Sequence, residues 1–487
     1  MLERSRKRPS TYGNPIRVSR LLSALVNAQD DNGILVGNWS GDYSGGTEPT
    51  AWSGSASIFE EYRRTGRPVM YGQCWVFGGL LTTALRVLGI PGRTVTNFSS
   101  AHDADANCLI DYHFDAEGNP LDTDDSVWNF HVWNDAWMAR SDLPKGYGGW
   151  QAVDATPQEL SDYVYRTGPS SLAAVKNGHV YLSYDTKFVF AEVNACKVKW
   201  RMPKDPSEPP KMISLDTNEI GTRVLTKAVG KNEREDITSQ YKPKEGSVLE
   251  YISLFAADTH VDKLRKLVGE QPPQDTSLEL KLPTDAMIGQ DVTLRAVLRK
   301  TCPEARSVNL SLTCNSMYYT GVKARVVVQT VNFVDITADK EEAVHEWQLK
   351  ASDYLPNLVD QAHLKFFVGM LVSDTYQTVT KAATFRLTKP EVDVQVPPTV
   401  SAGQPFKVTV TLTNPLSTML QGCFFHLEGP AVAAHSKESF RNVKANEKVE
   451  FQGTVTARKF TGVKDLLVSF SSLDLIGVSG KAFVVII

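Results

Sequence analysis

The stretch YGQCWVF, residues 71–77, places a small polar turn directly before a cysteine, and a long apolar run follows it. The apolar residues recur at helical spacing until Gly89 and Pro91, which predicts a helix that begins near Cys74. In the first turn of a helix, unpaired N–H groups and the positive end of the dipole favour a thiolate. Cys74 is therefore either a nucleophile or, like most free cysteines, a small buried residue of the core.

A cysteine nucleophile needs a base within hydrogen-bond reach and a third group that orients the base. His131 lies in WNFHVW, whose alternating aromatic residues predict a strand. Asp154 lies in GWQAVDATPQE, where an apolar run meets a Thr-Pro turn, which predicts a strand end. Taken singly, His131 has the alternative interpretation of a structural histidine and Asp154 that of a turn cap.

The composition excludes several classes of protein. The chain has 487 residues, which predicts about three domains, and 52 Lys and Arg against 55 Asp and Glu give a formal charge of −3. This balance argues against a broad nucleic-acid or anionic-membrane surface, and the basic tip RSRKR is expected to be solvated. We expect no membrane span and no secretory signal, because neither a long apolar run nor an apolar N-terminal segment is present.

The cysteines predict neither a zinc site nor a disulfide framework. They are scattered without a C-x-x-C pair: Cys74, Cys108, Cys196, Cys302, Cys314 and Cys423. We therefore expect a reducing compartment, most simply the cytoplasm.

The pattern along the chain changes twice. Residues 1–250 mix helical patterns with aromatic and β-branched runs such as WNFHVWNDAWM and KFVFAEVNA, which predicts a mixed α and β domain. A charged, Pro-containing linker is expected at residues 251–276. Residues 277–388 and 389–487 show strands of period two, and Gly-Gln pairs at 289 and 403 form a faint repeat, which predicts two β-sandwiches in tandem.

Three segments together, YGQCWVF, VWNFHVWNDAWM and GYGGWQAVDATPQE, resemble the active-site segments of the transglutaminase family. The resemblance continues through LVNAQDDNGILVGNWSG, GIPGRTVTNFSSAHD and KAVGKNEREDIT and, more weakly, into both β regions. It implies a multidomain α+β fold of the animal type, with a papain-like core before two immunoglobulin-like β-barrels. Members of the family begin with another β-sandwich and the early core, so we expect the core to be truncated at its N-terminus.

The resemblance implies a calcium-dependent protein-glutamine γ-glutamyltransferase. Cys74 would be the nucleophile, His131 its proton partner and Asp154 the group that fixes the imidazole. Proteins with accessible Gln and Lys, or small primary amines, would be the substrates, and nucleic acid would not be a partner. Two alternatives stay open: a non-enzymatic calcium-binding scaffold and a thiol amidohydrolase. Some relatives act outside cells without a signal peptide, so that location is an alternative to the cytoplasm.

Three aromatic residues receive roles from the same resemblance. Trp39 of GNWSG matches the indole that donates to the oxyanion, and Trp128 matches the second tryptophan of the tunnel for the acyl acceptor. Tyr319 of SMYYTG matches a tyrosine that bonds to the catalytic thiol in resting members. Without these motifs all three would be interpreted as ordinary buried aromatic residues.

Oxygen-rich clusters favour a hard cation over zinc. Asp103, Asp105 and Asn107 alternate in SAHDADANCLID, so their side chains could converge around Ca²⁺, although a solvated turn is the alternative. The resemblance implies three calcium sites. The first has Asn27 and Asp31 with the carbonyls of Ala24 and Gln29, and the second has Asn194, Glu245 and Glu250 with the carbonyl of Thr217. The third has Asp103, Asp105, Asn107 and Asp125 with the carbonyl of Leu109.

Overall fold

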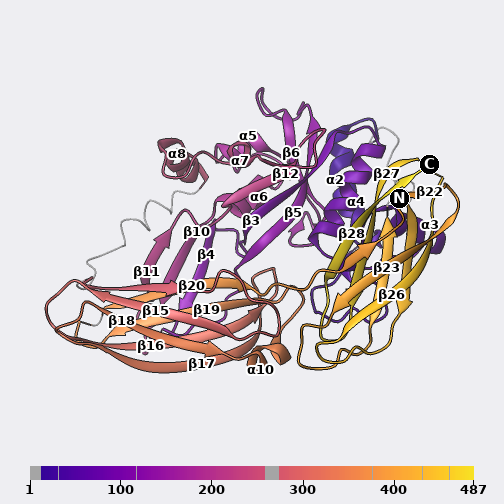
Figure 1. Cartoon of the computed structure of the whole chain (residues 1–487). Coiled ribbons are helices and arrows are strands. Elements are labelled where there is room, and N and C mark those ends of the chain that lie inside the picture. The colour runs from indigo at the N-terminus through magenta and orange to yellow at the C-terminus, as the bar shows by residue number, and fades with distance from the viewer. Residues whose placement is uncertain are drawn as a thin grey trace.

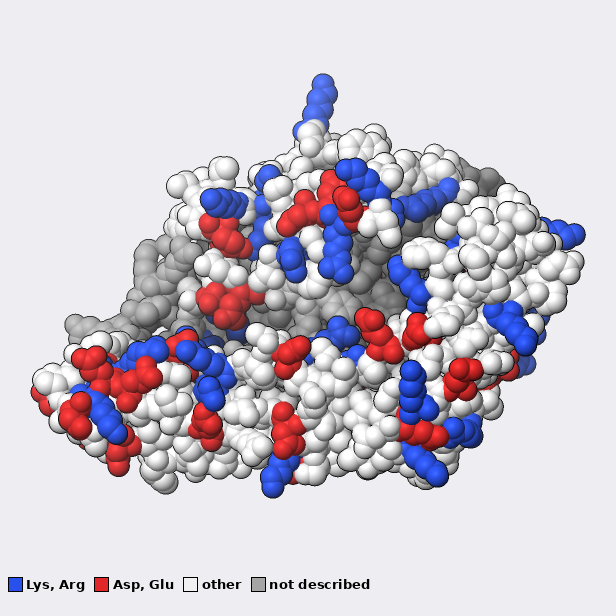
Figure 2. All heavy atoms as spheres, viewed as in Figure 1, with Lys and Arg blue, Asp and Glu red and all other residues white. Residues whose placement is uncertain are grey.

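The computed structural model describes residues 12–30, 32–116, 118–257, 274–375, 377–429, 432–459 and 461–487. Figure 1 shows a mixed core, indigo to magenta, with one orange β unit beneath it and a second, yellow β unit at its side. These parts confirm the predicted fold class of a mixed core followed by two β-sandwich units. On the face drawn in Figure 2, acidic and basic side chains are interspersed, and the surface is hollowed between the core and the β units.

The helices belong mainly to the core. They are α2 (Pro15–Val26), α3 (Ala56–Thr65), α4 (Cys74–Val87), α5 (Leu172–Lys176), α6 (Thr186–Asn194), α7 (Thr238–Tyr241) and α8 (Val248–Ala257), with the 3₁₀ turn η2 (Pro49–Ala51). The run KFVFAEVNA, rich in aromatic and β-branched residues, forms helix α6 rather than a strand. Its Val189, Phe190 and Val193 are buried in one core cluster, so packing overrides the local β-propensity.

A six-stranded sheet forms the centre of the core, in the order β13-β12-β3-β5-β6-β9. Its strands are β13 (Arg234–Asp236), β12 (Arg223–Lys227), β3 (Gly92–His102), β5 (Ser126–Met138), β6 (Gly149–Asp154) and β9 (Thr167–Ser171). A second sheet has the order β11-β10-β4, with β11 (Lys211–Asp216), β10 (Cys196–Arg201) and β4 (Leu109–Phe114). Two short pairs complete the core: β1 (Leu35–Gly37) with β2 (Val69–Gly72), and β7 (Leu160–Ser161) with β8 (Val164–Tyr165).

The first β unit has two sheets, β14-β15-β18 and β17-β16-β19-β20. Its elements are β14 (Thr276–Lys281), β15 (Val292–Lys300), β16 (Arg306–Met317), β17 (Lys323–Ile336), β18 (Glu342–Leu349), α10 (Ala351–Tyr354), η3 (Leu355–Asn357), β19 (His363–Val372) and β20 (Thr378–Arg386).

The second β unit has the sheets β21-β23-β26 and β22-β28-β27-β24-β25. Its strands are β21 (Asp393–Gln395), β22 (Thr399–Val400), β23 (Pro405–Thr413), β24 (Phe424–Gly429), β25 (Ala433–Ser439), β26 (Lys448–Thr456), β27 (Gly462–Ser471) and β28 (Val478–Ile486). Buried apolar side chains of the two units form one continuous cluster.

The Gly-Gln repeat occupies equivalent turns in the two units. Gly289 and Gly403 have φ of 95° and 78°, a region that favours glycine. In both turns the glutamine N–H donates to the carbonyl three residues earlier, at 3.0 Å for Gln290 and 3.1 Å for Gln404. The domain limits at residues 250, 276 and 388 stay predictions. Helix α8 runs across residue 250, and part of the expected linker lies outside the described residues.

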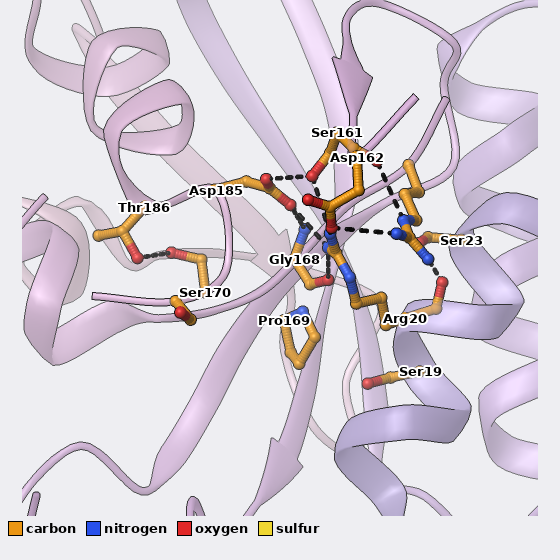
Figure 3. A network of polar contacts seen from close by, with 12 residues as sticks. Ser19, Arg20, Ser23, Ser161, Asp162, Gly168, Pro169, Ser170, Asp185 and Thr186 are labelled. Atoms are coloured by element: carbon orange, nitrogen blue, oxygen red, sulfur yellow. Dashed lines mark hydrogen bonds and ion pairs between the residues drawn. The ribbon is translucent and has the colours of Figure 1, made fainter. Parts of the chain in front are cut away.

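Arg20 fixes helix α2 to the rest of the core (Figure 3). Its guanidinium donates to the Gly168 carbonyl, the Asp185 carboxylate and the Ser161 hydroxyl, each at 2.8 Å, and to the Asp162 carboxylate at 3.0 Å. Asp185 directly precedes α6 and Gly168 lies in β9. A single buried side chain therefore holds together three elements that are far apart in the sequence.

The six cysteines are all free. Across the part of the chain that the structure describes, none of the helices combines the length and the apolar character that a membrane crossing needs.

Candidate active site

Cys74 is the first residue of helix α4, as the sequence predicts, and its side chain is fully buried. It lies in a small aromatic and apolar cluster with Trp128, Val132 and Tyr319. The two interpretations of Cys74 are therefore compatible, because the thiol is buried and also sits at the positive end of a helix.

His131 and Asp154 meet on neighbouring strands. His131 lies on β5 and Asp154 is the last residue of β6, as predicted, and Nε2 of the histidine is 2.7 Å from Oδ2 of the aspartate. Both residues are buried. The Thr156 N–H donates to the other carboxylate oxygen at 2.8 Å and so fixes its orientation.

The second nitrogen of the His131 imidazole, Nδ1, is available to interact with the Cys74 thiol. Among the described residues, Nδ1 is buried without a hydrogen-bond partner at ordinary geometry. Burial disfavours the imidazolium, but the Asp154 carboxylate and, to a smaller extent, the nearby Cys74 thiol outweigh it and raise the pKa of His131 well above its usual value. The structure thus brings together all three residues of the predicted Cys-His-Asp set.

Two polar residues beside this set were not predicted. The Gln158 side-chain amide donates to Asp154 at 3.1 Å and to Glu192 at 3.0 Å. Glu192 Oε1 is 3.6 Å from His131 Nε2, and burial raises the pKa of this carboxyl to about 8. The sequence did carry a signal for Glu192, because it is the one charged residue among the apolar residues of FVFAEV.

Tyr319 of the first β unit reaches into this centre. Its hydroxyl accepts from the Trp39 indole N–H at 2.8 Å and from the Cys74 backbone N–H at 3.5 Å. Burial, with contributions from the Cys74 thiol, raises the pKa of the Tyr319 hydroxyl far above its usual value. Trp128 stands edge-on to His131, with 4.8 Å between ring centroids, and to Tyr319 at 5.6 Å.

An acidic cluster lies where β3 ends and where β5, the strand that carries His131, begins. Asp103, Asp105 and Asp125 offer carboxylate oxygens that all lie within 4.8 Å of one another. Burial raises the pKa of Asp103 to about 6, with a further contribution from Asp105, and burial also raises the pKa of Asp125. Asn107 donates to Asp105 at 2.9 Å. This donor set suits a hard cation, because three carboxylates converge with no positive side chain between them among the described residues.

Comparisons with known proteins agree with the geometry. Residues 39–155 match the transglutaminase-like superfamily, and residues 390–486 match the C-terminal Ig-like domain of the transglutaminase family. The structure superposes on red sea bream transglutaminase with a TM-score of 0.84 and 31% identity, over 100% of this chain and 72% of that one. The chain belongs to the transglutaminase family.

Curated transglutaminases are similar over nearly the whole chain. Protein-glutamine gamma-glutamyltransferase K of Canis lupus familiaris is 42% identical over 96% of this chain, and the coagulation factor XIII A chain of Homo sapiens is 40% identical over 99%. The chain spans 57% and 66% of the lengths of these two relatives.

The second set of calcium ligands implied for this transglutaminase has polar atoms without partners in the described part of the chain, but one Glu245 oxygen is ion-paired with the buried Lys242. Both polar atoms of the Asn194 side chain and one oxygen of Glu245 are buried without a hydrogen-bond partner among the described residues. Glu250 is buried in the first turn of α8, where one of its oxygens accepts from the Gly246 N–H at 2.9 Å. Thr217 lies in the turn after β11.

The first set of implied calcium ligands, around Asn27, is less clearly arranged for a cation. Asn27 ends α2, and its amide donates to the carbonyls of Ser23 and Tyr165. Its side-chain oxygen accepts from the Gln29 N–H at 3.1 Å. Ala24 lies inside the helix, whereas Asp31 lies outside the described residues.

Proposed function

We propose that this chain is a calcium-dependent protein-glutamine γ-glutamyltransferase that forms Nε-(γ-glutamyl)lysine crosslinks. The observation that carries the proposal is the arrangement of Cys74 at a helix N-terminus with the buried His131–Asp154 pair at 2.7 Å. Family membership and the names of the relatives support the reaction class.

The first half-reaction uses the Cys74–His131 pair. The elevated pKa of His131 favours an imidazolium, which stabilises a thiolate on Cys74. The thiolate attacks the γ-carboxamide carbon of a protein glutamine, and the imidazolium gives its proton to the departing ammonia. A thioester is left on Cys74 and a neutral imidazole on His131. Asp154 holds the Nε2–H, so that Nδ1 faces the reacting atoms.

The oxyanion donors are the Trp39 indole N–H and the Cys74 backbone N–H. Both now donate to the Tyr319 hydroxyl, so this hydroxyl occupies the place that the substrate oxygen needs. The described geometry is therefore a resting state, and the first β unit must withdraw Tyr319 before acylation.

The second half-reaction consumes a lysine amine. The neutral imidazole of His131 takes a proton from the amine as it attacks the thioester, and the thiolate leaves as the isopeptide bond forms. Trp128 covers His131 edge-on and keeps water from this side of the site. Attack by water instead would give glutamate.

Calcium would be held by Asp103, Asp105, Asn107, Asp125 and the Leu109 carbonyl, by Asn194, Glu245, Glu250 and the Thr217 carbonyl, and at a site around Asn27. A bound ion would supply positive charge to the converging carboxylates, and these loop residues would then favour one arrangement over another. Asp125 directly precedes β5, which carries Trp128 and His131, so its loop has a short covalent route to the active site.

Proteins with accessible Gln and Lys, and small primary amines, are the proposed partners, without nucleic acid. The proposed location is the cytoplasm, and export without a signal is the alternative.

The test is calcium-dependent incorporation of a fluorescent primary amine into a glutamine-containing protein. We expect labelling with calcium, none with chelator and none with Cys74→Ala. Release of ammonia without amine incorporation would show an amidohydrolase. A folded chain that binds calcium but releases no ammonia would show a scaffold and contradict the proposal.

A further inference from the structure

The indole of Trp39 stands on an irregular stretch of the core. Residues 38–48 follow β1 and form neither helix nor strand before η2, and Ser40 and Gly41 of this stretch are exposed. In the resting arrangement the Tyr318 hydroxyl of the first β unit donates to the Ser40 carbonyl at 3.2 Å. That bond is lost when the first β unit withdraws, so contacts within the core must hold Trp39 during catalysis.

Gln73 connects this stretch to the helix that carries the nucleophile. It directly precedes Cys74, and it is fully buried. Its side-chain N–H₂ donates to the Asn38 carbonyl at 2.9 Å and to the Tyr43 hydroxyl at 3.0 Å. Because a carbonyl can only accept, the Asn38 bond fixes which end of the amide points to the loop. The residue before the nucleophile thus holds the residue before the indole.

The indole ring has two further contacts within the core. It stacks on Phe77, which lies one turn after Cys74 in α4, with 6.3 Å between ring centroids and 11° between ring planes. It also lies over Gly37, where an added Cβ would be 2.5 Å from the ring. These contacts set the plane of the ring, whereas the Gln73 bond holds the peptide group that leads into Trp39.

Gln73 also contacts the first β unit, but at longer distances. Its N–H₂ is 3.4 Å from the Asp360 carboxylate, and its side-chain oxygen accepts from the Gln361 amide at 3.5 Å. The shorter bonds to Asn38 and Tyr43 lie within the core and do not depend on that unit. Withdrawal of the first β unit therefore leaves the link between Gln73 and the loop in place.

We propose that Gln73 is a positioning residue that sets the distance between the two oxyanion donors, the Trp39 indole N–H and the Cys74 backbone N–H. This role rests on the proposed function and adds a residue that serves it. Without the Gln73 amide, the Asn38 carbonyl loses its donor and can turn toward water, and the indole N–H moves with it. Oxyanion donors act through preorganisation, so a small displacement lowers the rate strongly.

The test is a double-mutant cycle on amine incorporation at saturating calcium, where closure by the first β unit does not limit the rate. Gln73→Met keeps the length of the side chain and removes its N–H₂. It should lower kcat by about 30-fold, with little change in KM for the glutamine substrate. Trp39→Phe keeps a ring against Phe77 but removes the donor. In that background Gln73→Met should lower kcat by less than about threefold, because the donor that Gln73 positions is already gone.

Alkylation of Cys74 by iodoacetamide, at the same calcium concentration, separates donor positioning from a disturbed nucleophile. The thiolate displaces iodide from a saturated carbon, so no oxyanion forms. Gln73→Met and Trp39→Phe should therefore both be alkylated within about threefold of the native rate.

Two more variants complete the design. Gln73→Glu keeps the size of the side chain but turns a carboxylate toward the Asn38 carbonyl, so at neutral pH it should lower kcat at least as much as Gln73→Met. Tyr43→Phe is the matched control, because it removes the other partner of the same amide and leaves the Asn38 bond intact. It should change kcat at saturating calcium by less than about threefold.

Equal losses of kcat from Gln73→Met in the native and the Trp39→Phe backgrounds would overturn the proposal. A fall in the alkylation rate as large as the fall in kcat would overturn it too. Both results leave the proposed enzyme activity standing, because the native chain still incorporates amine. A native chain that incorporates no amine would instead contradict the proposed function, and the role of Gln73 with it.

Discussion

At the scale of single residues, the active site depends on how one imidazole is held. Asp154 accepts from His131 at 2.7 Å, and the Thr156 N–H holds the other carboxylate oxygen. An amide at this position can present its N–H₂ to Nε2 and so stabilise the wrong tautomer. We expect Asp154→Asn to lower kcat by about 10³-fold with little change in KM, measured by amine incorporation at saturating calcium. A kcat within tenfold of the native value, in a variant with an unchanged melting temperature, would contradict this role.

A second residue-scale prediction concerns pH. Burial and Asp105 raise the pKa of Asp103 to about 6 in the folded chain, above an unfolded value of about 3.9. The folded state holds this proton more tightly, so the contribution to stability is complete below the unfolded value and is lost as the pH rises through about 6.

Thermal unfolding without calcium should therefore show that Asp103→Asn gains in melting temperature, relative to the native chain, from pH 4 to pH 7. Added calcium should reverse the order at pH 7, because the native carboxylate is the better ligand. If the difference in melting temperature between Asp103→Asn and the native chain did not vary with pH, the pKa of Asp103 would not be raised by folding.

At the scale of elements, substitution of Arg20 tests how much the stability of the core depends on one buried side chain. It joins α2 to β9 and to the start of α6 by one hydrogen bond each, and two more reach Ser161 of β7 and the adjacent Asp162. We expect Arg20→Met to reduce the free energy of unfolding by about 3 kcal/mol, because the half-buried Asp185 would lose its ion pair and keep only its hydrogen bonds from Ser161 and Gly168. Arg17→Met, on the exposed face of the same helix, should change it by less than about 0.5 kcal/mol, as denaturant titration of both variants would show.

The sequence predicted elements better than the contacts between them. Apolar periodicity placed Cys74 at the start of α4, and alternation placed His131 on a strand. The Trp39–Tyr319 bond joins residues 280 positions apart, and only the resemblance suggested a role for either residue. Gln158 was missed because its importance comes entirely from its neighbours, and the β-branched and aromatic composition of KFVFAEVNA did not indicate the helix that burial stabilises there.

At the scale of the whole molecule, the proposed active site is closed by a residue from another unit. The Tyr319 hydroxyl accepts from both proposed oxyanion donors, and the Tyr319 carbonyl accepts from the Asn129 N–H at 2.7 Å. Gly321 in the same turn, with φ of 77°, lies so close to the Val127 carbonyl that an added Cβ would be 2.1 Å from its oxygen. The first β unit therefore contacts the core through a turn in which only glycine fits at position 321.

Removal of the Tyr319 hydroxyl should weaken this closed arrangement. We expect Tyr319→Phe to raise activity at low calcium several-fold, with a smaller effect at saturating calcium, because both donors are then free for substrate. The neighbouring Tyr318→Phe is the matched control, since its hydroxyl bonds to the Ser40 carbonyl outside the site. Identical calcium dependence of the native chain and Tyr319→Phe would rule out the tyrosine as a restraint.

Occupation of the two donors by Tyr319 also decides how inhibitors of this chain would be ranked. A compound that mimics the charged tetrahedral adduct must compete with an internal phenol, so its apparent dissociation constant is the intrinsic one divided by the fraction of molecules in which the phenol has left. At low calcium, the measured potency of a compound would then depend more on how tightly the first β unit is docked on the core than on how well the compound fits the site.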